Sequence, residues 1–107
     1  MDNTYQEQRD VFVAIADPTR RKLIRLLADA EELTIHELTA QFRMGRTAVS
    51  KHLTILKEAD LVTNRKLGRE TRYQLNAAPL QEVKDWLSFY EKFWNERAIL
   101  LKNILEE

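Results

Sequence analysis

The chain contains 107 residues, of which 44% are hydrophobic and 32% are charged, and its 17 basic residues balance its 17 acidic ones. This length and apolar content predict one folded domain over residues 1–107 and exclude a disordered tail. Because there is no cysteine, disulfides, thiolate metal ligands and a cysteine nucleophile are excluded. The polar N-terminus and the short apolar runs are unlike a signal peptide or a membrane span, so we expect a cytoplasmic protein with no membrane partner.

Basic residues are concentrated in one stretch of the chain. From Arg43 to Arg72 there are eight basic and three acidic residues, which gives these positions a net charge of +5. Such a patch on a neutral protein attracts a polyanion without making the whole surface adhesive. An ordinary solvated surface is the alternative explanation, and charge alone does not decide between the two.

Two helices are expected at the start of the chain. The apolar spacing predicts a first helix from Tyr5 to Ala16 and a second from Pro18 to about Ala28. Between them, Asp17 can accept hydrogen bonds from free amides, and proline suits the first position of a helix. Residues 29–33 are expected to form a polar connection.

Residues 34–59 are predicted to form a helix-turn-helix. Thr34 and Glu37 have the spacing of a capping box, which opens a short third helix that ends near Phe42. After a three-residue turn, a fourth helix is expected from Arg46 to Ala59. One side of this helix carries a narrow apolar stripe, and the other side carries basic and hydroxyl-bearing residues, as in a DNA recognition helix.

The pattern then changes to period two. Strands are expected over residues 62–67 and 70–75, joined by Gly68 and Arg69, because glycine permits the positive φ that a tight hairpin turn requires. The cationic tip of this hairpin, beside a helix-turn-helix, predicts a wing over residues 62–75. The elements together predict a mainly α protein with a small β-hairpin, in the order α-α-α-α-β-β-α, which is the winged helix-turn-helix fold.

From Pro79 the pattern predicts one unbroken helix to about Leu105, roughly 27 residues or about 40 Å long. Its apolar residues form a heptad seam that four short helices cannot cover, so we expect a second copy of the chain to bury it. A core helix of the monomer is the alternative. The predicted dimerisation segments are residues 1–16 and 79–105, and the predicted interface residues are Phe12, Leu80, Val83, Leu87, Tyr90, Trp94, Leu101 and Leu105.

Several of these segments resemble one family. The run Asp17-Pro18-Thr19-Arg20, the segment from Ala48 to Val62, and Gly68-Arg69 followed by Tyr73 are similar to the ArsR/SmtB family of bacterial repressors. The resemblance implies a dimeric winged helix-turn-helix protein that represses its operon and is released by a signal. Asp60 departs from the family pattern, which usually has glycine there, but Asp tolerates the left-handed conformation comparatively well.

The metal sites of the family are not matched here. Its site on the third helix requires a Cys-x-Cys pair, where this chain has Thr34 to Leu38, and its site on the last helix requires histidine, yet none follows His52. His36 and His52 are the only imidazoles and lie on different predicted helices. We therefore expect no metal and no cofactor, as in cysteine-free members that act as autorepressors or answer a non-metal signal.

Double-stranded DNA with a palindromic operator is the expected partner. Arg46 and Thr47 are the first candidates for reading bases, and Ser50 and Lys51 follow. The predicted DNA-binding residues are Arg43, Arg46, Thr47, Ser50, Lys51, His52, Thr54, Arg65, Lys66 and Arg69. For His52 we expect partial burial and a bond to a backbone group or a phosphate, in preference to a role as a pH switch.

Three further questions stay open at this point. Arg20 could reach a phosphate or pair with Asp17 or Glu37. The aromatic residues of the last helix could line an effector pocket, although such residues more often belong to a core. An unknown effector or a sequestering protein is a further candidate partner. A winged-helix module that binds proteins without binding DNA is the alternative function. No catalytic constellation is visible, so we do not expect an enzyme.

Overall fold

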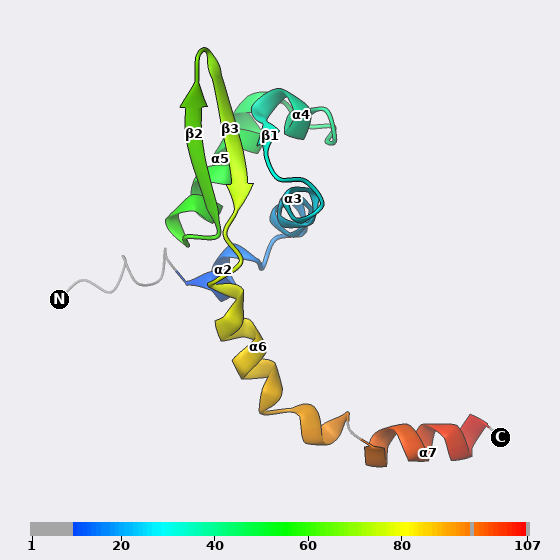
Figure 1. Cartoon of the computed structure of the whole chain (residues 1–107). Coiled ribbons are helices and arrows are strands. Elements are labelled where there is room, and N and C mark those ends of the chain that lie inside the picture. Colours follow the sequence, from blue (N-terminus) through cyan, green and yellow to red (C-terminus); the bar gives the residue numbers. More distant parts are fainter. Residues whose placement is uncertain (1–9, 95, 107) are drawn as a thin grey trace.

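The computed structural model describes residues 10–94 and 96–106, and for residues 96–99 it describes the backbone only. The elements are α2 (Val11–Ala14), α3 (Pro18–Ala28), β1 (Leu33–Thr34), α4 (Ile35–Thr39), α5 (Arg46–Glu58), β2 (Val62–Leu67), β3 (Glu70–Leu75), α6 (Leu80–Ser88), the 3₁₀ helix η1 (Glu91–Phe93) and α7 (Glu96–Glu106). Figure 1 shows α2 to α5 and the sheet gathered together, with α6 leading away from them towards α7.

The first two described helices begin where aspartate side chains cap them. Asp17 Oδ1 accepts hydrogen bonds from the amides of Thr19 at 2.7 Å and Arg20 at 3.2 Å, and α3 spans the predicted residues. Asp10 has extended backbone angles and accepts from the amide of Phe12 at 2.8 Å, so α2 begins at residue 11. The predicted start of this helix at residue 5 lies outside the described residues, but its predicted passage through residue 10 is wrong, because an N-cap residue lies outside the helix it caps.

The helix-turn-helix is confirmed, with one change of length. Both hydrogen bonds of the capping box between Thr34 and Glu37 are present. Helix α4 ends at Thr39 and does not reach Phe42. The amides of Gln41 and Phe42 donate to carbonyls only three residues earlier, so the chain tightens into turns before α5 begins.

Helix α5 ends in a Schellman motif. The amide of Asp60 donates to the carbonyl of Lys57 at 3.0 Å, and the amide of Leu61 donates to that of Leu56 at 3.0 Å. This motif requires a left-handed residue at its centre, and Asp60 has φ +61°. The expectation that aspartate occupies the usual glycine position is confirmed.

The wing is confirmed as an antiparallel hairpin, with Val62 paired to Leu75 and Gly68 at φ +66° in the turn. The predicted polar connection over residues 29–33 is only partly correct, because β1 pairs antiparallel with β3 and makes a three-stranded sheet of order β1-β3-β2. A two-residue strand is too short to show a period-two pattern. Its pairing arises from the tertiary structure.

The core lies between the helices and the base of the wing. The apolar stripe of α5 is fully buried, as predicted, against side chains of α2, α3, α4 and the start of β2. The buried core residues are Val11, Ala14, Leu23, Leu27, Ile35, Leu38, Val49, Leu53, Leu56, Ala59, Leu61 and Val62. This core holds α5 in place so that its opposite face points outward.

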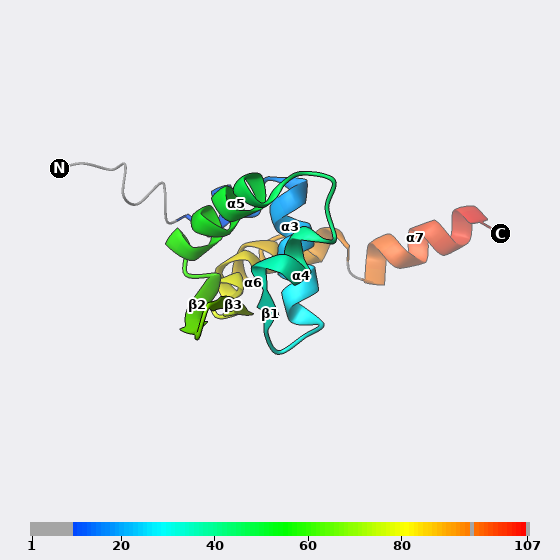
Figure 2. The same ribbon diagram turned by 90° about the horizontal axis from the view of Figure 1, so that it is seen from above.

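The prediction of one unbroken C-terminal helix is wrong. After Ser88 the amides of Tyr90, Phe93 and Trp94 donate to carbonyls three residues earlier, which are tight 3₁₀-type turns. Aromatic residues are weak helix formers, and their rings contact one another here, with the Trp86 and Tyr90 centroids 5.4 Å apart in an edge-on arrangement. The heptad seam is therefore interrupted, and Figure 2 shows α7 apart from α3, α4, α5 and the sheet.

Candidate nucleic-acid interface

The outward face of α5 carries the predicted reading residues. Arg46, Thr47 and Lys51 are exposed and Ser50 is half-buried, whereas the stripe on the opposite face is buried. Thr54 is also exposed, but its hydroxyl donates to the carbonyl of Ser50 at 3.0 Å. The hydroxyl proton of Thr54 is thus used within the helix, and its oxygen remains able to accept a hydrogen bond.

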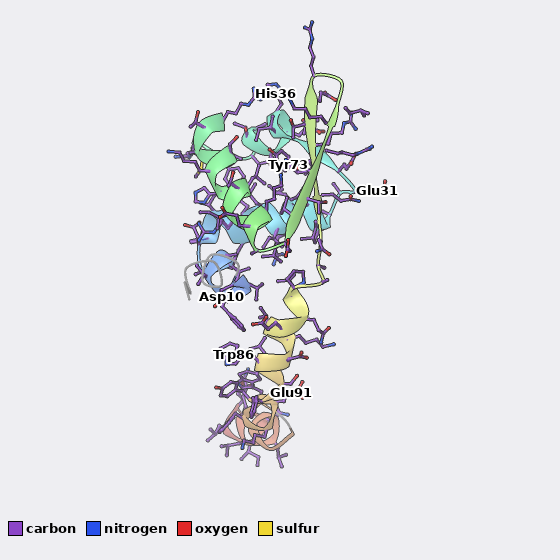
Figure 3. All side chains as sticks on the ribbon, turned by 90° about the vertical axis from the view of Figure 1, so that its left-hand side faces the viewer. Asp10, Glu31, His36, Tyr73, Trp86 and Glu91 are labelled. Atoms are coloured by element: carbon purple, nitrogen blue, oxygen red, sulfur yellow. The ribbon has the colours of Figure 1, made fainter. Side chains whose placement is uncertain are left out.

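The start of α5 lies at the same end of the molecule as the wing tip (Figures 1 and 3). Arg43 is exposed in the connection before α5, and Lys66 and Arg69 are exposed near the hairpin turn. Within the described ranges, none of these three cations takes part in a salt bridge. The arrangement offers a polyanion a cationic surface built from two separate elements.

Arg65 differs from its neighbours because its charge is already paired. Its Nε and Nη2 donate to the two carboxylate oxygens of Glu32 at 2.6 and 3.0 Å. These hydrogen bonds hold the pKa of the Glu32 carboxyl below its ordinary value of 4.5 and raise the pKa of Arg65. Arg72 lies opposite Arg65 in the hairpin, and its Nη1 is 3.9 Å from the same carboxylate.

Glu32 was not identified as a functional residue from the sequence. A signal for it exists in the hairpin register, because the turn at Gly68 and Arg69 places Arg65 directly opposite Arg72. Like charges at such a pair are destabilising unless an acid lies nearby. The register predicts the need for a carboxylate but does not say which one supplies it.

The arginine of α3 holds the end of α2. Arg20 Nε donates to the carbonyl of Ala14 at 2.6 Å, and Nη2 donates to that of Val13 at 3.3 Å. Within the described residues, neither the Asp17 nor the Glu37 side chain accepts a hydrogen bond from the Arg20 guanidinium. Backbone carbonyls take the place of these two carboxylates, which the sequence pattern does not reveal.

His52 is half-buried, as expected, but within the described residues its ring contacts a side chain and no backbone group. Its Nδ1 lies 3.2 Å from Nη1 of Arg20. Because a guanidinium has only donors, Nδ1 is the acceptor in this contact. Burial raises the pKa of nearby Asp17, but amide hydrogen bonds from Arg20 and Thr19 and the charge of Arg20 outweigh it and lower the pKa overall.

The predicted interface residues fall into two groups. Phe12, Leu80 and Val83 pack against the core of their own chain. The others are exposed on α6, on either side of η1 and on α7, with exposed fractions from 40% for Leu87 and Tyr90 to 77% for Leu105. Further large apolar side chains accompany them on the same segments, namely Trp86, Phe89, Phe93, Leu100 and Ile104. Figure 3 shows Trp86 at the end of the molecule opposite His36, so this apolar surface is distant from the cationic one.

Within residues 10–94 and 96–106, no group of three or more histidine, aspartate or glutamate side chains could hold a metal ion together. In the same ranges, no helix combines the length and the apolar character needed to cross a bilayer.

Comparison with known proteins gives a consistent result. Residues 17–64 match the family described as bacterial regulatory protein, arsR family. The transcriptional repressor SdpR of Bacillus subtilis is 36% identical over 88 residues, which cover 81% of this chain and 97% of that protein. The HTH-type transcriptional regulator Rv2034 of Mycobacterium tuberculosis is 36% identical over 86% of this chain and 82% of that protein. The structure of an ArsR-like transcriptional regulator from Rhodococcus sp. RHA1 superposes with a TM-score of 0.70 at 33% identity, over 99% of this chain and 97% of the other.

Proposed function

The chain belongs to the ArsR family of bacterial regulatory proteins and is a DNA-binding transcriptional regulator, and from this premise we propose that it is a homodimeric repressor of an inverted-repeat operator. Because bacterial DNA lies in the cytoplasm, the proposal places the protein there. The observation that carries it is the exposed polar face of α5 beside a wing with a cationic tip.

In this proposal α5 enters the major groove and the wing lies against the adjoining backbone. Arg46 can bind guanine through O6 and N7, and the methyl group of Thr47 can contact thymine. Lys51, Arg43 and Lys66 contribute phosphate contacts, which supply much of the affinity and make it depend on salt. Arg69 is suited to a narrow minor groove.

The dimer is supported by the apolar surface on the C-terminal segments. A single chain of this size seldom exposes so many large apolar side chains together, and Phe89 and Leu105 are 78% and 77% exposed. A second copy packed on α6, η1 and α7 would remove them from water. Two recognition helices about 34 Å apart would then read half-sites one duplex turn apart, so the operator is an inverted repeat.

Release from DNA belongs to the same proposal. The chain has no cysteine for the family's thiolate site, and the described residues hold no group of three metal-ligating carboxylates and imidazoles. We therefore assign release to a non-metal signal, to a sequestering protein, or to the falling concentration of an autorepressor.

The test selects duplexes from a random pool with the full-length protein. Enriched inverted repeats with half-sites about 10 base pairs apart support the proposal. Arg46→Ala should weaken binding and relax the sequence preference, whereas Lys51→Ala should weaken binding to all duplexes alike and lower the salt slope by about one. Enrichment of single half-sites, or of no sequence at all, would contradict it.

Sedimentation tests the dimer separately. Leu101→Asp places a charge on the exposed apolar surface, so it should yield the 12.7 kDa monomer at concentrations where the unmodified chain is a dimer. Asn103→Asp adds the same charge to an exposed polar position of α7 and is the matched control. A dimer that Leu101→Asp leaves intact would refute the proposed interface.

A further inference from the structure

A groove lies between the first turn of α4, the start of α5 and the wing tip. Its volume is about 250 Å³, and one basic side chain lines it from each element: His36, Arg46 and Arg69. Figure 3 shows His36 at this end of the molecule. Of the three, only His36 is absent from the predicted DNA-binding residues.

The groove is cationic. Glu70 is the only acidic residue in its lining, and it is bound by Arg72, whose Nη2 lies 2.9 Å from the carboxylate. Within the described part of the chain, Arg46 and Arg69 form no salt bridge. Two guanidinium groups thus face the groove with their charge uncompensated there.

The capping box of α4 uses two of the amides near the groove. Thr34 Oγ1 accepts from the amide of Glu37 at 3.1 Å, and Glu37 Oε1 accepts from the amide of Thr34 at 2.9 Å. The charged donors that line the groove are side chains. Guanidinium and imidazole groups together provide only donors when the imidazole is protonated, which suits an anion with several acceptor oxygens.

We propose that this groove is a phosphate seat, in which His36 holds one phosphodiester group of the DNA backbone between Arg46, on the reading helix, and Arg69, on the wing. The inference rests on the proposed function and assigns a contact to the first helix of the helix-turn-helix. Arg46 and Arg69 add positive charge on either side of that phosphate, while their guanidinium groups serve the base and minor-groove contacts proposed above. Phosphate contacts of this kind set the register in which bases are read.

The seat makes DNA binding depend on pH near neutrality. Histidine ordinarily titrates near pH 6.5, and the protonated ring adds a charge and a second donor towards the phosphate. The charged groups that share the groove with His36 are Arg46, Arg69 and Glu70, and Glu37 follows His36 on α4. A bound phosphate adds a negative charge, so DNA and protons bind to the seat cooperatively.

The experiment measures the affinity of full-length protein for a labelled random-sequence duplex, because a phosphate contact does not need the operator. At about pH 6 the unmodified chain should bind about threefold more tightly than at about pH 7.5, because one charge pair about 4 Å apart in water contributes about fivefold and an ordinary histidine is only partly protonated at about pH 6. The slope of log affinity against log salt should also steepen by about one. His36→Gln should lose both the gain in affinity at the lower pH and the steepening of the salt slope. His52→Gln changes the other histidine and should keep them.

A second measurement does not depend on any variant. The ring resonances of His36 in the unmodified chain, followed by NMR at about pH 6, should move when the duplex is added. Unmoved resonances, or an acid increment that survives in His36→Gln, would overturn the seat. If inorganic phosphate shifts the His36 resonances and the duplex does not, the groove binds free phosphate, and its assignment to DNA is overturned. Duplex binding that is tight but independent of pH rejects the seat alone, whereas no duplex binding at any pH rejects the regulatory function with it.

Discussion

Arg20→Met is the substitution for which the structure predicts the clearest loss of stability. The carbonyl of Ala14 needs an unusual donor, because the residue four positions later is Pro18, which has no amide hydrogen. Arg20 Nε supplies that donor at 2.6 Å. Methionine keeps much of the apolar stem of arginine but cannot donate.

The expected loss of stability depends on how far each of the two carbonyl groups that Arg20 binds is buried. Ala14 is fully buried, with 0% of its surface exposed, so water does not readily replace the lost donor. A hydrogen bond to a charged group contributes about 1.5–3 kcal/mol. Val13 is exposed, and its carbonyl also accepts from the amide of Ala16, so it adds little. We expect Arg20→Met to lower the free energy of unfolding by about 2 kcal/mol.

Urea unfolding at a fixed protein concentration measures this loss, since a dimer's midpoint depends on concentration. With a slope of about 1–3 kcal/mol per molar urea, the midpoint should fall by about 1 M. Arg21→Met is the matched control, because Arg21 is exposed and donates to the carbonyl of Ile15 at 2.8 Å, and it should cost less than about 1 kcal/mol. Equal losses in the two variants would refute the reasoning about the Ala14 carbonyl.

Three other predictions concern the helix ends and the wing. Asp60→Gly should raise the free energy of unfolding by about 1 kcal/mol, because φ is +61° there and glycine adopts it without strain; a lower urea midpoint would contradict this. The pKa of Glu37 is lowered from 4.5, first by the backbone hydrogen bond from Thr34 and then by the hydrogen bond with the Thr34 side chain. The ionised Glu37 carboxylate therefore stabilises the fold fully above pH 4.5, and this stabilisation is lost as pH falls through the lowered pKa. Glu37→Ala should accordingly lower the urea midpoint at about pH 7 and have less effect at about pH 3, and an equal effect at both would count against it. Glu32→Gln removes the charge that pairs Arg65, so the salt slope of DNA binding should steepen by up to about one, and an unchanged slope would exclude Arg65 from the DNA contacts.

The C-terminal segment shows where periodicity misleads. The repeat of apolar residues every three or four positions indicated one long helix, and its apolar content is indeed exposed on the described monomer. The aromatic residues between Phe89 and Trp94, however, contact one another through tight turns that end α6 at Ser88. Periodicity indicates which face of a helix is apolar. It does not indicate whether contacts between side chains favour an interruption of the helix.

Local chemistry made much of this protein predictable from its sequence. Asp17 before proline, the Thr34 and Glu37 pair and Gly68 each act on backbone groups within a few residues, so their effects do not depend on the rest of the fold. The buried stripe of α5 and its polar outer face follow from the same reasoning, because helical periodicity separates the two faces whatever packs against them.

The tertiary structure decided the pairings between distant residues. The contact of Arg20 with His52, the clamp of Glu32 on Arg65 and the strand β1 all join positions more than 30 residues apart. The groove that collects His36, Arg46 and Arg69 likewise exists only after the wing has folded beside α4 and α5. Hydrogen bonds and charge pairs require atoms within a few ångströms, and in the sequence no short-range rule brings such residues together; the packing of the buried core does.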